Sequence, residues 1–530
     1  MLADASITPQ PELIVNRQFA GSARAVHQRP GFAFGISMSS TRMFNYEAIS
    51  SENYQGWHTG DGATYLYNSD LDEYSDAYWP TVNRKRLAGT TVDTQTLANN
   101  ADQSTFSTFA WAGGAELLGL YGVTGMELDA RSSTLTARKS WFAFDNEIVA
   151  LGSGITSTDN RTIETIVENR RLIDSASALT VDGIAKPATL GWSETMSGIG
   201  WAHLAATGGT IFHGGATVKG LREARNGAWS EINAAGSSAI LTRNYATLWL
   251  DHGANPTNAT YAYTQLPGAS AAQTSAYAAN PDVVILANTA AIHAVREQSL
   301  GITAANFWND GTSTAGLITT DKKCSVLVRE TTTQLDIAMS DPTQLGGIVT
   351  IELARSAVSL TSADPAITVL QRSPTIRFTA NLSATFGRTL TATFKDTPFN
   401  AWQHAHFAAD LRQSAPLLDP DNDGAANLLE YATGTDPLAD SSAQRPVQSI
   451  ANIAGTNFLT LTFRRRTGAS GVSIFVEGTG NLLAGPWLPD PVQLGTSMDN
   501  GDGTETVTFR DIIPLGSVPL RVIRLKITTP

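Results

Sequence analysis

The chain has 530 residues, which is long enough for several independent hydrophobic cores, and its 45 Gly and 22 Pro indicate many turns. The chain has 36 Lys and Arg residues and 48 Asp and Glu residues, which gives a net charge of -12. This argues against a nucleic-acid partner, because no excess positive charge is available to neutralise phosphates. No stretch approaches the roughly 18 apolar residues of a membrane span, and residues 1–20 lack the basic-then-apolar order of a signal peptide, so no export signal is visible.

Short β-strands are predicted along the whole chain, because apolar and β-branched residues alternate with polar ones at period 2. The clearest cases are residues 140–144, 246–250, 349–353, 375–378 and 459–463. Strands of this length, separated by Gly, Asn and Asp turns, predict an all-β protein of stacked antiparallel sheets. Only short helices are expected, around residues 289–298 and 428–432.

Composition shifts divide the chain into four parts. The pattern of strands breaks near residues 305–320 and again near 396, and a segment rich in Asp, Ala, Pro and Asn follows. We therefore predict two β-domains, a linker and a small accessory β-domain with strands near 458–465, 472–477, 505–510 and 520–527. The predicted bounds are 1–310, 311–395, 396–440 and 441–530.

Local basic patches are needed if a chain of this charge is to bind an acidic polymer. There are two candidates, the first of them near the amino terminus, and the alternative is that both are scattered charges in contact with water. The candidates are Arg24, His27, Arg29 and Arg42, and the run Arg84, Lys85 and Arg86.

The linker contains a candidate calcium loop at residues 419–430, DPDNDGAANLLE. Side-chain oxygens stand at loop positions 1, 3, 5, 9 and 12, a glycine stands at position 6, and position 7 donates its backbone carbonyl, as an EF-hand-type loop requires. The predicted ligands are Asp419, Asp421, Asp423, Ala425, Asn427 and Glu430. The loop resembles single dockerin-like or thrombospondin-type-3-like repeats of secreted bacterial proteins, so its calcium is predicted to be structural. The alternative is a solvated acidic linker.

Residues 24–93 carry an order of aromatic, glycine and charged residues that ordinary strands do not require. The segments are 26–32 (VHQRPGF), 45–47 (NYE), 52–53 (EN), 56–62 (GWHTGDG), 65–68 (YLYN), 78–82 (YWPTV) and 87–91 (LAGTT). Further segments are 139–142 (KSWF), 147–149 (EIV), 164–170 (ETIVENR), 251–253 (DHG) and 261–263 (YAY). In this order, over roughly residues 17–395, they resemble polysaccharide lyase family 8, which includes hyaluronate, chondroitin AC and xanthan lyases.

This resemblance implies a large antiparallel β-supersandwich followed by smaller β-sandwich domains. It also implies β-elimination on an acidic, uronate-containing polysaccharide of the hyaluronan, chondroitin or xanthan type, without an organic cofactor. The Asn, His and Tyr that carry this reaction in the family lie on an α/α toroid that precedes the β-domain. Because the first motif begins at Val26, the toroid is predicted to be absent, and a separate toroid domain becomes a possible partner.

The resemblance further implies which residues the β-domain contributes to the substrate cleft. Glu47 matches a supporting acidic residue that orients a cleft His or Arg. Ser50 stands where the family has an amide, whereas Glu52 and Asn53 match. Trp57 is a candidate sugar platform, and its alternative is a core residue, since Trp buries a large apolar area wherever it lies.

Three functional hypotheses remain open. The first is a lyase, extracellular or periplasmic by resemblance, that is incomplete and needs a toroid. The second is a non-catalytic extracellular carbohydrate-binding or scaffold protein built from lyase β-domains. The third is full activity from this chain alone, which would need another base such as His27, His58 or Tyr46.

Overall fold

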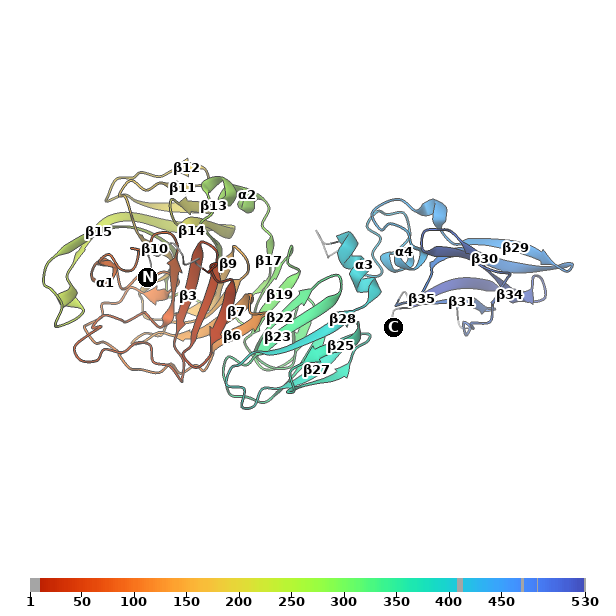
Figure 1. Ribbon diagram of the computed structural model, residues 1–530, viewed down its shortest axis with the longest axis horizontal. Helices are drawn as coiled ribbons and strands as arrows, with labels where there is room; N and C mark the ends of the chain where they lie inside the picture. The colour runs from red at the N-terminus through yellow and green to blue at the C-terminus, as the bar shows by residue number, and fades with distance from the viewer. Residues whose placement is uncertain (1–9, 408–412, 469–470, 484, 529–530) are drawn as a thin grey trace.

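The computed structural model describes residues 10–407, 413–468, 471–483 and 485–528, and strands dominate these ranges as predicted (Figure 1). The α-helices within them are short: α1 (Tyr78–Thr81), α2 (Ala271–Ala279), α3 (Pro398–Phe407) and α4 (Asn427–Thr433). None of these described helices has the length and apolar character needed to cross a membrane.

The described chain opens with a four-stranded antiparallel sheet whose strands pair in sequence order. The strands are β1 (Val15–Phe19), β2 (Arg24–Arg29), β3 (Phe32–Met38) and β4 (Asp61–Tyr67). Each pairs with its neighbour in the chain, so short turns suffice to connect β1 to β2 and β2 to β3.

A twelve-stranded antiparallel sheet forms the second layer. Its strands are β5 (Thr91–Asp93), β6 (Ala112–Leu117), β7 (Tyr121–Asp129), β8 (Thr136–Ala143), β9 (Ile148–Thr156), β10 (Thr162–Arg171), β11 (Leu179–Val181), β12 (Ile184–Ala185), β13 (Ser193–Leu204), β14 (Gly208–Gly227), β15 (Leu241–Ala254) and β16 (Ala259–Pro267). The 20-residue β14 pairs with β13, β15 and β16 and therefore ties the sheet together.

The two sheets enclose one hydrophobic core, because successive side chains of a strand point to opposite faces. Ala25, Phe34 and Leu66 of the small sheet are buried against residues of the large sheet such as Trp141 and Tyr263. The opposite face of the small sheet points away from this core. This pair of layers is the supersandwich that was expected.

A second sandwich follows, built from a seven-stranded and a five-stranded antiparallel sheet. The seven strands are β17 (Val283–Asn288), β18 (Ile292–Glu297), β19 (Ile302–Phe307), β22 (Cys324–Glu330), β23 (Gln334–Ser340), β25 (Ala357–Ala363) and β28 (Leu390–Asp396). The five are β20 (Ser313–Ala315), β21 (Ile318–Thr320), β24 (Ile348–Leu353), β26 (Ile367–Gln371) and β27 (Ile376–Asn381). Phe378 and Phe394 meet between the sheets with ring centroids 6.5 Å apart.

The two sandwiches divide earlier than the predicted boundary at residue 310. Strands β17, β18 and β19 pair with one another and with β22, so they belong to the second sandwich. The large sheet ends at Pro267, and α2 stands between it and Val283. The break in pattern after residue 305 marks the end of β19 and not the end of a domain.

The helix predicted around residues 289–298 is wrong, because Ile292–Glu297 form strand β18. Ala294 is buried in the core of the second sandwich, and Val295 is buried on the other face, against the first. A strand that is buried on both faces loses the period-2 alternation that identifies strands in a sequence.

The C-terminal unit is a small sandwich that lies at one end of the molecule, and α3 and α4 lie between it and the second sandwich (Figure 1). Its strands are β29 (Val447–Ile453), β30 (Thr456–Arg466), β31 (Ser473–Thr479), β32 (Val492–Gln493), β33 (Met498–Asp499), β34 (Thr504–Pro514) and β35 (Val522–Thr528). The four strands and the helix near residues 428–432 that the sequence predicted in this region are confirmed.

Lys139 provides a test of the core of the first sandwich. Its ammonium group is buried, donates to Gly89 O at 2.5 Å, and has its pKa lowered to about 7 by burial. Between that value and the usual 10.5, the unfolded chain binds more protons than the folded one, so the free energy of unfolding should rise with pH. We expect Lys139→Met to remove this rise in urea unfolding at pH 7, 8 and 9. Equal pH slopes for the two proteins would contradict the assignment.

Candidate functional site

A cavity of about 810 Å³ lies on the outer face of the four-stranded sheet. Val26, Gly35 and Tyr65 lie side by side across β2, β3 and β4 and form its floor. A Cβ added at Gly35 would meet nothing nearer than Tyr65 Cβ at 3.9 Å, so the missing side chain leaves the floor hollow. The same alternation that fills the core therefore shapes the cavity.

Aromatic rings line much of this cavity. Tyr65 and Trp79 lie with ring centroids 6.4 Å apart, and Tyr67, Trp229 and Phe19 are each at least one-third exposed. Burial raises the pKa of Tyr65 to about 12, so its hydroxyl is protonated at neutral pH. Partly exposed rings of this kind offer flat apolar faces to a ring-bearing ligand.

Two arginines supply positive charge to the cavity. Arg24 Nη1 donates to the carbonyls of Ser22, Ala23 and Met38 at 3.0, 3.1 and 3.0 Å. Arg84 donates to Trp79 O at 2.7 Å. Burial lowers the pKa of both guanidinium groups, yet arginine remains charged at neutral pH. Arg84 also pairs with Glu231 at 3.5 Å, whereas no ion pair of Arg24 is found among the described residues. The cavity therefore combines at least one unpaired cation with aromatic faces.

Two loops that are distant in sequence join to form a wall of the cavity. Tyr54 N donates to Ile232 O at 3.0 Å, and Ala234 N donates to Ser51 O at 2.9 Å. Glu52 and Asn233 form an isolated antiparallel bridge between the same loops. Residues 45–60 and 228–240 are thus held together by backbone bonds.

The supporting residue Glu47 and the predicted substrate-binding residues separate into those that line the cavity and those that do not. Glu52 and Asn53 line the cavity, and Asn53 Nδ2 donates to Glu47 O at 2.8 Å. Glu47 and Ser50 are exposed on the same loop but do not line the cavity. Trp57 is 8% exposed and donates from Nε1 to Ala98 O at 3.0 Å, so it occupies the core position that was its alternative.

The three residues considered as alternative bases are all buried outside the cavity lining. Tyr46 donates its hydroxyl to Ala101 O at 2.6 Å, and burial raises its pKa to about 12. Burial lowers the pKa of His27 to about 3. His58 Nδ1 pairs with Asp61 Oδ2 at 2.9 Å. None of the three is placed to reach a ligand in the cavity.

Some arginines of the predicted basic patches line the cavity and others do not. Arg24 and Arg84 reach the cavity, whereas Arg29 pairs with Asp145 at 3.2 Å and Arg86 pairs with Glu164 at 2.7 Å. Sequence analysis missed Trp229 and its loop, which lie about 150 residues along the chain from Arg84. A short-range sequence signal could not have joined these segments.

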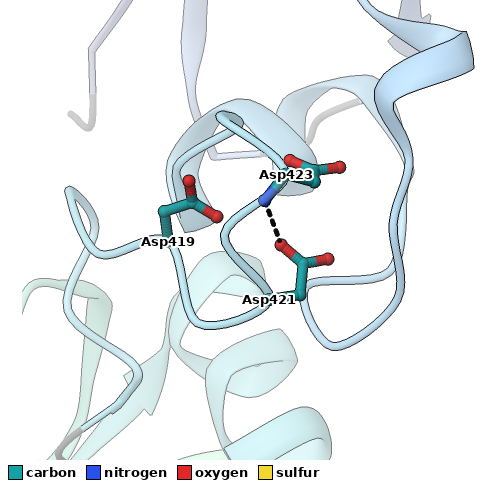
Figure 2. A group of neighbouring side chains, drawn as sticks. All are labelled: Asp419, Asp421 and Asp423. Carbon is teal, nitrogen blue, oxygen red and sulfur yellow. Dashed lines mark hydrogen bonds between the residues drawn. The ribbon is translucent and has the colours of Figure 1, made fainter.

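The candidate calcium loop forms a compact acidic group (Figure 2). Asp419, Asp421 and Asp423 each offer an oxygen, and these oxygens lie within 4.8 Å of one another. Asn427 and Glu430 of the same loop are fully buried, whereas a solvated linker, which was the alternative, would leave them exposed. Burial, reinforced by the neighbouring aspartates, raises the pKa of Glu430 to about 8.

The architecture is that of a multidomain β-sandwich protein with a site suited to an anionic, ring-bearing ligand. The chain belongs to polysaccharide lyase family 8: the profile of its super-sandwich domain matches residues 14–278, and that of its C-terminal beta-sandwich domain matches residues 284–350. The gap between the two matches falls where the two sandwiches divide.

Curated relatives include a xanthan lyase of Bacillus sp. (strain GL1), 49% identical over 403 residues, and a hyaluronate lyase of Thermasporomyces composti, 40% identical over 393 residues. These matches cover 74% and 73% of this chain but 43% and 50% of the relatives. The chain therefore spans about half the length of the curated relatives it matches.

Solved structures give the same assignment. The Paenibacillus xanthan lyase aligns with a TM-score of 0.73 and 36% identity over 99% of this chain and 53% of that one. The Streptomyces coelicolor A3 chondroitin AC lyase in complex with chondroitin sulphate aligns with a TM-score of 0.67 and 38% identity over 75% of this chain and 52% of that one. The first alignment extends through the C-terminal unit.

Arg84 is expected to hold the cavity wall together, because it donates to Gln55 Oε1 at 2.6 Å and pairs with Glu231 at 3.5 Å. Arg84→Ala removes these two contacts and the hydrogen bond to Trp79 O, and should destabilise the wall locally by about 1–3 kcal/mol. Hydrogen exchange should accelerate in residues 228–240, whereas Lys85→Ala, which removes a charge one position away, should leave it unchanged. Equal exchange in both variants would contradict this role.

Proposed function

We propose that this chain supplies the β-domain side of a polysaccharide lyase that cleaves a uronate-containing polymer of the hyaluronan, chondroitin or xanthan type by β-elimination. Membership of family 8 supports the reaction class. The observation that carries the proposal is a cavity in which Arg24 and Arg84 stand beside exposed aromatic rings. Cations match a uronate carboxylate, and aromatic faces match sugar rings.

The reaction requires three events on the substrate. Its carboxylate is neutralised, a base removes the C5 proton, and the electron pair expels the O4 leaving group as the double bond forms. Neutralisation of the carboxylate is essential for removal of the C5 proton. While the adjacent carboxylate is fully negative, the C5 proton is too weakly acidic for a base to remove it. Glu47, Ser50, Glu52 and Asn53 are proposed to support this centre from one loop, with Glu47 orienting a cleft cation.

A helical toroid is proposed to complete the active site, either from the same polypeptide or from another chain. Tyr46, His27 and His58 are engaged elsewhere, and Tyr65 is protonated at neutral pH. None of these groups is a suitable base in the cavity. We further propose an extracellular or periplasmic location, because a polysaccharide chain does not cross a membrane unaided.

The decisive experiment measures unsaturated uronate by ultraviolet absorbance with hyaluronan, chondroitin and xanthan as substrates. The purified chain is assayed alone and with a supplied family 8 toroid domain. We expect product only when the toroid is present. Product from the chain alone would refute the need for a toroid, and binding without product in either case would favour the non-catalytic carbohydrate-binding alternative.

Arg24→Gln should weaken the binding of chondroitin oligosaccharides to the chain about tenfold, which corresponds to the loss of one charge-assisted contact of about 1.4 kcal/mol. Calorimetry at low and moderate salt measures the affinity. Arg388→Gln serves as the control, because Arg388 is exposed on the second sandwich and pairs with Asp364 at 2.7 Å. Equal losses in the two variants would show that net charge, and not the cavity, attracts the ligand.

A further inference from the structure

Residues 419–430 lie at the junction between the second sandwich and the C-terminal unit, and the lyase reaction makes no use of them. The three aspartates alone would not define a site, because exposed acidic groups often cluster without a ligand. Four oxygen atoms here are buried and have no hydrogen-bond donor in the described structure. They are Asp419 Oδ1, Asp421 Oδ2, Asn427 Oδ1 and Glu430 Oε2.

The burial of these atoms is costly unless something pairs with them. Asn427 and Glu430 are each 0% exposed, and an unpaired buried acceptor costs about 1–3 kcal/mol, or more when it is charged. Asn427 Nδ2 donates to Gln413 O at 2.7 Å and to Ala415 O at 2.9 Å, so both N–H groups of its amide are paired. Its amide oxygen has no hydrogen-bond donor in the described structure. The unpaired atoms are three carboxyl oxygens and one amide oxygen, which are the kinds of oxygen that calcium takes as ligands.

We propose that residues 419–430 bind one calcium ion, and that this ion fixes the junction between the second sandwich and the C-terminal unit. Asp419, Asp421, Asp423, Asn427 and Glu430 supply side-chain oxygens, and Ala425 supplies its backbone carbonyl. Calcium takes 6 to 8 oxygen ligands in flexible geometry, whereas magnesium demands a near-ideal octahedron and keeps several waters. A set rich in protein oxygens therefore favours calcium.

The backbone of the loop is already arranged for an ion. Asp423 N donates to Asp421 Oδ1 at 3.1 Å, and Gly424 N donates to Asp419 Oδ2 at 2.8 Å (Figure 2 shows the first of these bonds). Gly424 has φ +88°, a conformation that glycine adopts without strain. These bonds hold the carboxylates close together, which is unfavourable for like charges. Arg445 Nη2 lies 3.8 Å from Asp423 Oδ1 and offsets part of this repulsion, and a cation bound among the aspartates would offset the rest.

The loop contacts elements on both sides of the junction. Asp423 Oδ2 accepts bonds from Ser441 N at 2.6 Å and Ser441 Oγ at 2.7 Å, just before the first strand of the C-terminal unit. Tyr431 follows Glu430 in α4 and packs against Phe399 of α3 with ring centroids 5.1 Å apart. Arg466 Nε of β30 donates to Tyr431 O at 2.5 Å. An ion in the loop thus holds α3, α4 and β30 through one network.

Calcium binding is tested on the full chain after treatment with EDTA and exchange into metal-free buffer. Titration with calcium chloride in a calorimeter should give one site, and magnesium chloride should bind at least tenfold more weakly. Asp421→Asn, which preserves the shape of the side chain, should weaken calcium binding at least tenfold. Asp499→Ala removes an exposed aspartate at the end of β33 in the C-terminal unit and should leave the binding unchanged. Absence of binding to the wild-type chain, or equal binding to Asp421→Asn, would overturn the site.

The role of the ion at the junction is tested by small-angle scattering and thermal unfolding with calcium or with EDTA. We expect EDTA to broaden the distribution of interatomic distances and to lower the Tm of the wild-type chain by about 5 °C. Asp421→Asn should resemble the EDTA-treated wild type under both conditions, and circular dichroism checks that it remains folded. Calcium binding without any change in scattering or Tm would overturn the junction role. Neither measurement depends on lyase activity.

Discussion

The packing of the four-stranded sheet on the twelve-stranded sheet is the constraint on which both the fold and the cavity depend. Phe34 and Leu66 point into the shared core, while Val26, Gly35 and Tyr65 on the same strands point outward to the cavity floor. A slip of one residue in the pairing of these strands would exchange the two sets. Selection for a filled core therefore also fixes which side chains a ligand meets.

The fold was largely predictable, because period-2 alternation survives wherever a strand has one buried face. The predictions failed where a strand is buried on both faces. Strand β18 is buried on both faces between two sandwiches, so its sequence lacks a clear period-2 alternation, and a helix was predicted there. The boundary at residue 310 failed for a related reason: β17 to β19 belong to the second sandwich but pack against the first, so no shift in composition separates them.

The candidate site was predictable only in its contiguous part. Glu52 and Asn53 lie within the motif that carries the family resemblance, and both line the cavity. Trp229 and Asn233 come from a loop that is held at the cavity by backbone hydrogen bonds to residues 51–54. Their local sequence contains no signal that predicts this long-range contact. The calcium loop is the opposite case, since all its proposed ligands lie within twelve consecutive residues and spacing alone suffices to find it.

Net charge is a poor guide to the ligand, because the distribution of paired and unpaired charges decides what a surface attracts. The chain has a net charge of -12, yet among the described residues no carboxylate lies within ion-pair distance of Arg24. Two other arginines of the predicted basic patches, Arg29 and Arg86, are each neutralised by an acidic partner. A guanidinium that is half buried and held only by carbonyls keeps its charge with little solvent screening, so it can attract an anion to an otherwise acidic protein. The aromatic rings beside it add flat apolar faces, and this combination is what supports the proposal of a ring-bearing anion such as an acidic polysaccharide.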